Sequence, residues 1–230
     1  MNIDVIVPCY NEEKTIETVI LECLKNLSSH DNLLVVDDAS TDKSNLIIKD
    51  LAKKFTNIHL IKHEKNLGKG ASIHTALKNV KNEIVIIQDS DLEYNPNEYK
   101  RLINPILKSG ADVVYGSRFV SSDEHRVLYF WHKIGNNVLT FLSNIFSNIN
   151  HTDMMVGFKA FRSEKILKLN LKQKRFGFEP EVTIKLSKLK CVFYEVGISF
   201  RGRTYEEGKK MRVRDAIVAI YCIFRYAIFD

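Results

Sequence analysis

The sequence predicts an α/β fold, in which helices cover both faces of a mostly parallel central sheet. Short apolar segments of strand length alternate with segments whose apolar residues recur every three or four positions. No linker, internal repeat or low-complexity segment divides the chain, so we expect a single domain over residues 1–230. With 45% hydrophobic residues, a chain of this length can bury a full core.

The first half of the chain alternates regularly between the two patterns. The predicted strands are residues 3–8, 33–36, 58–61, 83–88 and 112–115. The predicted helices cover residues 16–27, 47–55 and 73–80, and a fourth starts at about residue 97. Ser40, Thr41 and Asp42 offer capping side chains for the second helix, and Pro105 is expected to kink or end the fourth. This alternation implies right-handed crossovers between parallel strands.

The pattern changes after Arg118. The elements expected there are a long amphipathic helix over 127–149, a strand over 157–161, a helix through Glu181, Ile184 and Leu186, a strand over 192–200 and a final helix from about Arg212. The apolar run 216–224 in this last helix is typical of a packed helix. Basic residues before it and aromatic residues within it also fit a helix that lies on a membrane surface.

Polar residues follow four of the predicted strands. They are Tyr10-Asn11-Glu12, Asp37-Asp38, the Asn66–Gly70 loop and Asp89-Ser90-Asp91. Ligands of parallel sheets bind beyond the carboxyl ends of the strands, where these residues are expected to converge. Asp89 and Asp91 alternate along an extended chain and can share one face, which suits a divalent cation that bridges substrate phosphates. The pattern therefore favours an enzyme.

Composition excludes several classes of protein. No apolar run approaches the ~20 residues that span a bilayer, and the N-terminus enters a strand pattern at once, so no secretory signal is expected. The four cysteines lack C-x-x-C pairs and are typical of core residues in a reducing compartment. We therefore expect a cytoplasmic chain.

The formal net charge is +6, and most basic residues are scattered at helix-surface spacing. The exception is a basic segment before the apolar tail, made of Arg201, Arg203, Lys209, Lys210, Arg212 and Arg214. This arrangement favours a membrane surface or a polyphosphate. No zinc-finger spacing or isolated basic recognition helix is present, so no nucleic-acid partner is expected.

Two nucleotide-binding motifs are absent from the sequence. Neither a G-x-G-x-x-G after the first strand nor a phosphate-loop lysine motif is present. A nucleotidyltransferase, which uses a similar sheet and metal carboxylates, would carry a Gly-rich basic loop where this chain has Tyr10-Asn11-Glu12. That activity and a non-catalytic binding role are the alternatives from other classes.

Ordered motifs run along most of the chain. They are V-I-V-P-C-Y-N-E-E, V-V-D-D-A-S-T-D, N-L-G-K-G, I-I-Q-D-S-D-L-E, G-S-R, D-M-M-V-G-F-K-A-F-R, F-G-F-E-P-E and G-R-T-Y-E-E-G-K-K. The chain therefore resembles a family 2 glycosyltransferase with the GT-A nucleotide-sugar fold. It most resembles the polyprenyl-phosphate branch, which includes dolichyl-phosphate mannosyltransferase and bacterial polyprenyl-phosphate glucosyltransferases.

The resemblance implies an inverting enzyme that uses Mg²⁺ or Mn²⁺. It would move a sugar from a nucleotide sugar of the UDP-glucose or GDP-mannose type to polyprenyl phosphate, at the cytoplasmic face of a membrane. Residues 1–118 would bind the donor, 119–211 the acceptor, and 212–230 would make peripheral membrane contact, with a membrane-protein partner or a homo-oligomer as alternatives. The alternative acceptor is a polysaccharide or glycolipid.

The resemblance also assigns site residues. Those expected to bind the donor are Pro8, Tyr10, Glu12, Asp37, Asp38, Lys69, Asp89 and Ser90. The metal would be held by Asp89, Asp91 and Glu93, although Glu93 could equally be a helix-start acid with no ligand role. The expected catalytic residues are Asp91, Arg203, Arg118 and Asp153, with Arg203 on the diphosphate. The acceptor would meet Arg118, Glu179 and Lys209.

The two possible acceptors need different groups. A lipid phosphate is already an anion and requires no general base, whereas a sugar hydroxyl requires a carboxylate to take its proton. Asp153 and Glu179 are the candidates for that role. They could equally be polar groups that hold the second half together.

Overall fold

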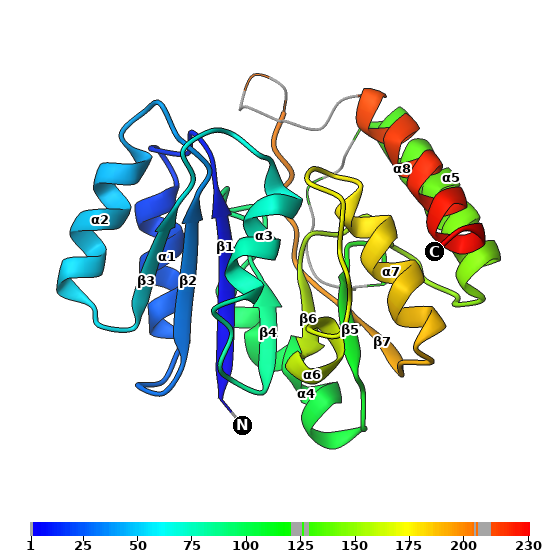
Figure 1. Cartoon of the computed structure of the whole chain (residues 1–230), viewed down its shortest axis with the longest axis horizontal. Helices are drawn as coiled ribbons and strands as arrows, with labels where there is room; N and C mark the ends of the chain where they lie inside the picture. Colours follow the sequence, from blue (N-terminus) through cyan, green and yellow to red (C-terminus); the bar gives the residue numbers. More distant parts are fainter. Residues whose placement is uncertain (1, 121–125, 127–128, 205, 207–212) are drawn as a thin grey trace.

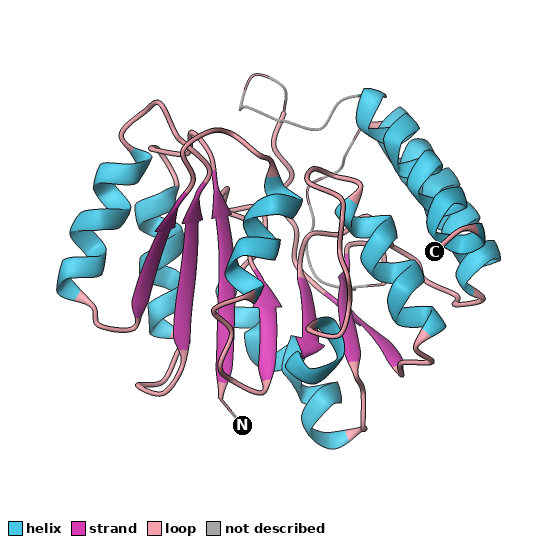
Figure 2. Cartoon of the chain, viewed as in Figure 1, coloured by secondary structure: helices cyan, strands magenta, loops and turns pink. Residues whose placement is uncertain are grey.

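The computed structural model describes residues 2–120, 126, 129–204, 206 and 213–230. Its strands are β1 (Ile3–Cys9), β2 (Asn32–Asp37), β3 (Ile58–Lys62), β4 (Ile84–Ile87), β5 (Val113–Ser117), β6 (Lys159–Arg162) and β7 (Phe193–Gly197). They form one seven-stranded sheet in the order β3-β2-β1-β4-β6-β5-β7. Only β6 runs antiparallel to its neighbours, β4 and β5. The predicted fold class, a mostly parallel sheet between helices, is confirmed (Figures 1 and 2).

Helices lie on both faces of this sheet, and α3 crosses in front of it in the view of Figure 1. The α-helices are α1 (Ile16–Lys25), α2 (Ser44–Lys54), α3 (Lys69–Leu77), α4 (Tyr99–Lys108), α5 (Phe130–Ser147), α6 (Ser163–Ile166), α7 (Phe178–Lys188) and α8 (Val213–Ile228). A 3₁₀ turn, η1 (Pro96–Glu98), leads into α4. The short α6 was not expected from the sequence.

Burial explains why the central strands read as continuous apolar runs. All seven residues of β1 and all four of β4 are buried, because helices cover both faces of these strands. Edge strand β3 exposes His59 and Lys62. Pro8 is tolerated in the central strand β1 because the pairing with β4 ends earlier, at Ile6 opposite Ile87.

The strand order places a switch point between β1 and β4. From β1 the chain proceeds outward through β2 to β3, and β4 then pairs with the other side of β1. The loops that leave β1 and β4 therefore diverge, and a crevice opens between them. Tyr10–Glu12 follow β1 and Asp89–Asp91 follow β4, so the predicted convergence of these polar residues has a topological cause.

Of the loop residues predicted to cap α2, Asp42 accepts the N–H of Ser44, the first residue of the helix, at 2.9 Å. Lys43, at the N-cap position itself, makes no side-chain cap bond. Ser40 Oγ accepts the Asn11 N–H at 3.0 Å, and the other Asp42 oxygen accepts the Glu13 N–H at 3.0 Å. These bonds tie the loop after β2 to the loop after β1. Pro105 does not end α4, which continues to Lys108, although only the last turn of the helix follows the proline.

Two glycines of the N-L-G-K-G motif allow a loop from the second half of the chain to pack directly against the start of α3. Gly68 has a φ of +101°, which glycine adopts without strain. A Cβ at Gly70 would lie 2.3 Å from the carbonyl oxygen of Gln173, and one at Gly68 would lie 2.5 Å from that of Lys174. The Ala71 N–H donates to Lys174 O at 3.0 Å. The N-L-G-K-G motif therefore places Lys69 under a loop of the second half.

Helices α5 and α8 lie side by side and pack against α7 (Figure 1). Leu139, Met154, Met155, Ala219 and Ile223 form a small core between them. Their other faces expose large apolar side chains: Phe130, Trp131, Ile134, Val138, Phe141 and Ile145 on α5, and Ile217, Val218, Tyr221, Phe224 and Ile228 on α8. We call these residues the α5/α8 apolar face. Among the residues described here, no helix combines the length and apolar character that a membrane crossing requires.

The close contact at Gly70 yields a stability prediction. Gly70→Ala should lower the free energy of unfolding by ~1–3 kcal/mol, because the added methyl group meets backbone that cannot move aside. Gly135→Ala is the matched control, since Gly135 is also helical but nothing lies within 4 Å of its added Cβ. The free energy of unfolding of that variant should rise by up to ~1 kcal/mol, because alanine has a higher helix propensity than glycine. Urea denaturation measures both, and equal effects would contradict the proposed packing.

Candidate active site

A cavity of about 860 Å³ opens at the carboxyl ends of β1 and β4. Both halves of the chain line it, including the loop before β6, the first turns of α5 and the start of α8. The predicted site residues that line it are Pro8, Tyr10, Glu12, Asp38, Lys69, Asp89, Ser90, Asp91, Glu93, Arg118, Glu179 and Arg203. The structure therefore brings most of the predicted residues into one place.

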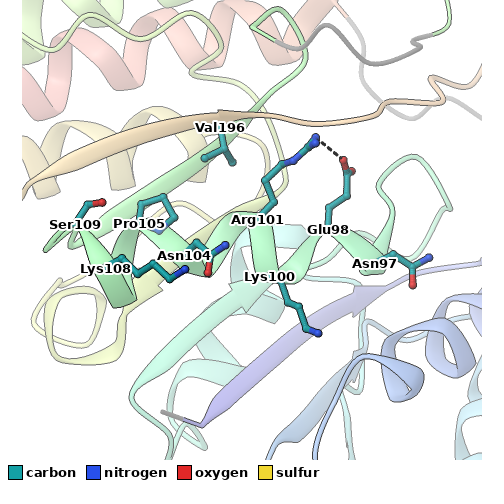
Figure 3. Close-up of a pocket in the computed structure, with 9 residues that line it drawn as sticks. All are labelled: Asn97, Glu98, Lys100, Arg101, Asn104, Pro105, Lys108, Ser109 and Val196. Atoms are coloured by element: carbon teal, nitrogen blue, oxygen red, sulfur yellow. Dashed lines mark hydrogen bonds and ion pairs between the residues drawn. The ribbon is translucent and has the colours of Figure 1, made fainter.

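A second hollow lies over α4, away from these strand ends (Figure 3). Arg101 pairs there with Glu98 at 3.2 Å, and Lys100 points away from that pair. Its remaining lining consists of surface residues of α4 and the edge residue Val196. This hollow lacks the convergent acids and cations of the larger cavity, so we assign the candidate site to the larger one.

Two predicted residues that the structure describes do not line the cavity, and a third cannot be placed. Asp37 is fully buried, and its carboxylate accepts from the Ser40 N–H at 3.2 Å and from Asn45 at 2.8 Å. It shapes the β2 loop instead of facing a nucleoside. Asp153 is also fully buried. Lys209, predicted to meet the acceptor, lies outside the described residues.

Arg203 connects the loops after β1 and β4. Its guanidinium donates to both carboxylate oxygens of Glu12, each at 3.1 Å, and to Asp91 at 2.6 Å. Its backbone N–H donates to Glu93 at 2.8 Å. A residue far along the chain thus neutralises carboxylates that would otherwise repel one another across the crevice.

The carboxylates that follow β4 are only partly neutralised by the neighbouring cations. Burial, together with the charges of Asp89 and Glu93, raises the pKa of Asp91 to about 7, against the opposing effect of Arg203. Burial also raises the pKa of Glu93. Carboxylates whose pKa values are raised in this way form a cluster that a cation would stabilise.

The three carboxylates predicted to hold a metal are not already assembled as a metal site in this structure, so their role stays a prediction. Within the described part of the chain, no three His, Cys, Asp or Glu side chains come together in a way that could hold a metal ion. Glu93 instead accepts the Arg203 N–H. Asp89 and Asp91 remain, and a pair of carboxylates fits a hard cation whose other ligands are phosphate oxygens and water.

Asp38 organises the loop that carries Lys69. Its carboxylate accepts the N–H groups of Leu67 at 2.8 Å and Gly68 at 2.7 Å, and it lies 2.7 Å from His63 Nδ1. These partners hold the carboxylate in place at the wall of the cavity. Its principal role in the structure is to hold the loop before α3.

Lys69 lies between two carboxylates. Its ammonium is 2.8 Å from Asp89 and 3.3 Å from Glu179. Burial alone would lower the pKa of Lys69, but these two charges raise it above its usual value, so the group stays protonated. The pair rests on Gly157, where a Cβ would lie 2.3 Å from Asp89 and 2.9 Å from the Lys69 ammonium. Only glycine leaves this space.

Arg118 is held by Asp153 in a bidentate pair. Its Nε and Nη2 each lie 2.6 Å from a carboxylate oxygen of Asp153, and Nη2 also donates to Asn136 at 3.2 Å. Asp153 is therefore engaged as a partner of Arg118. Glu179 is likewise engaged, by Lys69 and by Lys159. Neither predicted base has a carboxylate free to take a proton from a substrate.

Sequence reasoning missed several functional candidates. Lys133, Arg175 and Arg214 add positive charge to the cavity lining, and Trp131 lies at its edge. Lys159 is fully buried beneath the cavity; burial lowers its pKa, against the effect of Glu179. A lysine in the middle of the otherwise apolar predicted strand 157–161 was the available signal for Lys159. Arg214 was marked only as part of the basic segment before the apolar tail. No signal marked Lys133, Arg175 or Trp131, because scattered basic residues are common on helix surfaces.

The family model described as "Glycosyl transferase family 2" matches residues 4–169. The chain belongs to glycosyl transferase family 2. It is therefore a glycosyltransferase, as the motifs implied. Among curated relatives, it is 30% identical to UDP-N-acetylglucosamine--dolichyl-phosphate N-acetylglucosaminyltransferase of Methanococcus voltae, over 96% of this chain and 92% of that one. It is 28% identical to a dolichol-phosphate mannosyltransferase of Pyrococcus furiosus, over 91% and 60% of the two chains.

Solved structures show the same fold. Glucosyl-3-phosphoglycerate synthase from Mycobacterium tuberculosis, crystallised with Mn²⁺, UDP and phosphoglyceric acid, superposes with a TM-score of 0.76 at 20% identity. The match covers 100% of this chain and 79% of that one. Another crystal structure of that synthase contains Mg²⁺ and UDP. This family 2 glycosyltransferase thus has the GT-A fold that its motifs implied.

The raised pKa of Asp91 predicts how the stability of the metal-free glycosyltransferase depends on pH. Its pKa is about 7 when folded and 3.8 ordinarily, so the folded state binds more protons between these values. Stability should therefore fall as pH rises from 5 to 8, by ~2–3 kcal/mol from this group. Urea denaturation measures the free energy of unfolding across this pH range. Asp91→Asn should flatten its dependence on pH, whereas Asp50→Asn, at an exposed position on α2, should retain that dependence. An Asp91→Asn profile with the wild-type slope would contradict the assignment.

Proposed function

We propose that this glycosyltransferase transfers a sugar, with inversion, from a nucleotide sugar to polyprenyl phosphate, using Mg²⁺ or Mn²⁺. In this proposal, residues 1–118 bind the donor and residues 119–211 bind the acceptor. The enzyme lies peripherally at the cytoplasmic face of a membrane, with the last helix, over residues 212–230, on the lipid. The observation that carries the proposal is one cavity in which acids, cations and an adjoining apolar surface meet.

The donor is proposed to lie at the switch point. Departure of a nucleoside diphosphate develops negative charge on its β-phosphate, and fixed cations stabilise that charge. Arg203 and Lys69 are the cations nearest the strand ends, and each is already held by carboxylates that fix its position. Pro8 and Tyr10 line the wall on the β1 side, where the nucleoside would lie.

Asp89 and Asp91 are proposed to hold the divalent cation together with the donor diphosphate. A bound Mg²⁺ or Mn²⁺ would neutralise the oxygens of the leaving diphosphate. The excess of carboxylate charge around Asp91 supports this role, as do the metal ions named for the synthase of similar fold. Asp89 would then be shared between the cation and Lys69.

The state of the predicted bases supports a phosphate acceptor. Asp153 is paired with Arg118, and Glu179 is paired with the buried Lys159, so neither suits the abstraction of a proton from a hydroxyl. A lipid phosphate needs no such group. Arg118, Lys133, Arg175 and Arg214 line the second-half side of the cavity, where they can meet an anionic acceptor. The names of the curated relatives also specify dolichyl phosphate.

The α5/α8 apolar face supports contact with a membrane. Trp131 is 76% exposed and Phe130 66%, and Trp131 also lines the cavity. The exposed apolar side chains thus continue from the mouth of the cavity along both helices. Basic lining residues Lys133 and Arg214 belong to the same two helices, and cations beside apolar side chains favour anionic lipid surfaces.

The transfer reaction itself is the direct test. The protein with Mn²⁺ and radiolabelled UDP-glucose or GDP-mannose should label undecaprenyl or dolichyl phosphate in a product released by mild acid. Asp91→Ala should reduce this transfer by at least ~100-fold, because a cation ligand is lost, while circular dichroism shows an intact fold. Label in a saccharide with none in lipid would overturn the proposed acceptor. Turnover unchanged in Asp91→Ala would overturn the metal role.

Membrane contact can be followed through Trp131, the single tryptophan of the chain. Vesicles that contain anionic phospholipid should shift its emission to shorter wavelength, because the exposed indole enters an apolar environment. Phe141→Ser with Ile217→Ser should weaken this binding, since both side chains are about two-thirds exposed and lie on that face. The control is Leu46→Ser, an exposed apolar side chain on α2. Emission that vesicles leave unchanged would contradict the proposed contact.

A further inference from the structure

Lys159 is a buried cation that the proposed reaction does not use. It opens β6 and has no exposed surface. Its ammonium contacts the Glu179 carboxylate and donates to the carbonyl oxygens of Met154 at 3.1 Å and Val156 at 2.5 Å. Three acceptors saturate its three N–H donors. The ammonium also lies 4.5 Å from the centre of the Tyr115 ring. Its position is therefore fixed from several sides.

Glu179 connects Lys159 to the residues that line the cavity. One of its oxygens contacts Lys159, and the other lies 3.3 Å from the ammonium of Lys69. Lys69 in turn lies 2.8 Å from Asp89. Charges therefore alternate along a chain of four side chains, from Lys159 through Glu179 and Lys69 to Asp89. Its members come from β6, α7, α3 and the loop after β4, and Asp89 belongs to the proposed cation site.

We propose that Lys159 is a positioning residue for the donor site, which acts through Glu179 to keep Lys69 shared between Glu179 and Asp89. This inference rests on the proposed function of Asp89 and Lys69. Glu179 is only 3% exposed, so its carboxylate needs a cation nearby. When Lys159 supplies that cation, Lys69 is free to neutralise Asp89. Without Lys159, Glu179 should draw Lys69 away from Asp89.

This role predicts an effect that a purely structural ion pair would not produce. Loss of Lys159 should leave Asp89 without its neighbouring cation, so that Mn²⁺ alone binds more tightly. Transfer should nevertheless slow, because Lys69 no longer lies beside the diphosphate. If Lys159 merely held β6 to α7, its loss would loosen the site and weaken both Mn²⁺ binding and transfer. The sign of the change in Mn²⁺ affinity therefore separates the two roles.

The experiment titrates Mn²⁺ alone into the full chain and measures bound metal by electron paramagnetic resonance. Lys159→Met should bind Mn²⁺ about tenfold more tightly than the wild type, because one compensating positive charge is gone. Its kcat for transfer should fall about tenfold. The double variant Lys159→Met/Glu179→Gln should return to within about twofold of the wild-type Mn²⁺ affinity, since no buried carboxylate then competes for Lys69.

Lys185 provides the matched control. It also lies beside a carboxylate and an aromatic ring, with its ammonium 3.0 Å from Glu181 and 4.7 Å from the Tyr226 ring centre. It does not line the cavity or contact the chain of charges. Lys185→Met should lower the thermal midpoint yet leave the Mn²⁺ affinity within about twofold of the wild type.

The outcomes distinguish this inference from the proposed function. If the wild type binds Mn²⁺ and transfers sugar, but Lys159→Met binds Mn²⁺ equally or more weakly, the inference is wrong and the proposed function stands. If the wild type neither binds Mn²⁺ nor transfers sugar, both are wrong. Should Lys159→Met fail to fold, Lys159→Gln replaces it, because the amide retains N–H donors for the carbonyls of Met154 and Val156 while lacking the charge.

Discussion

Carboxylates at the carboxyl ends of β1 and β4 repel one another, and cations from distant parts of the chain offset that repulsion. Arg203 pairs with Glu12 across 191 residues of sequence and with Asp91 across 112. Lys69 separates Asp89 from Glu179. Because few of these groups reach solvent, removing one cation would leave a buried acid unpaired, which costs more than the pair itself contributes. The crevice is thus built as a charge-balanced unit.

This balance joins the two halves of the fold. The first half supplies the sheet edge and its acids, and the second half supplies Arg203, Glu179 and Lys159. The backbone permits the contact at three glycines. Gly68 and Gly70 admit the 173–175 loop, and Gly157 admits the Lys69–Asp89 pair. A donor diphosphate that enters the crevice would meet cations already oriented by carboxylates, so little reorganisation is needed when charge develops.

The same arrangement distinguishes the possible acceptors. Ion pairing removes Asp153 and Glu179 from acid–base chemistry, and their partners Arg118 and Lys69 line the cavity. An acceptor that is already anionic suits such a lining. Trp131 belongs both to the α5/α8 apolar face and to the lining of the cavity. A lipid phosphate has both chemical characters, an anionic head and an apolar chain.

The sequence by itself determined the order of elements, the fold class and the edge at which the polar residues gather. Strand periodicity, glycine placement and the D-x-D spacing are local properties, and motifs in sequence order were enough to identify the family. Tertiary structure alone decided what each acid does. Asp37 and Asp38 are adjacent, yet one is buried within the β2 loop and the other lies at the cavity wall. The sequence left the roles of Glu93 and Asp153 open and gave none to Lys159, because the role of a charged group depends on its partner. Those partners lie far away in sequence, and only the path of the folded chain brings them within hydrogen-bonding distance.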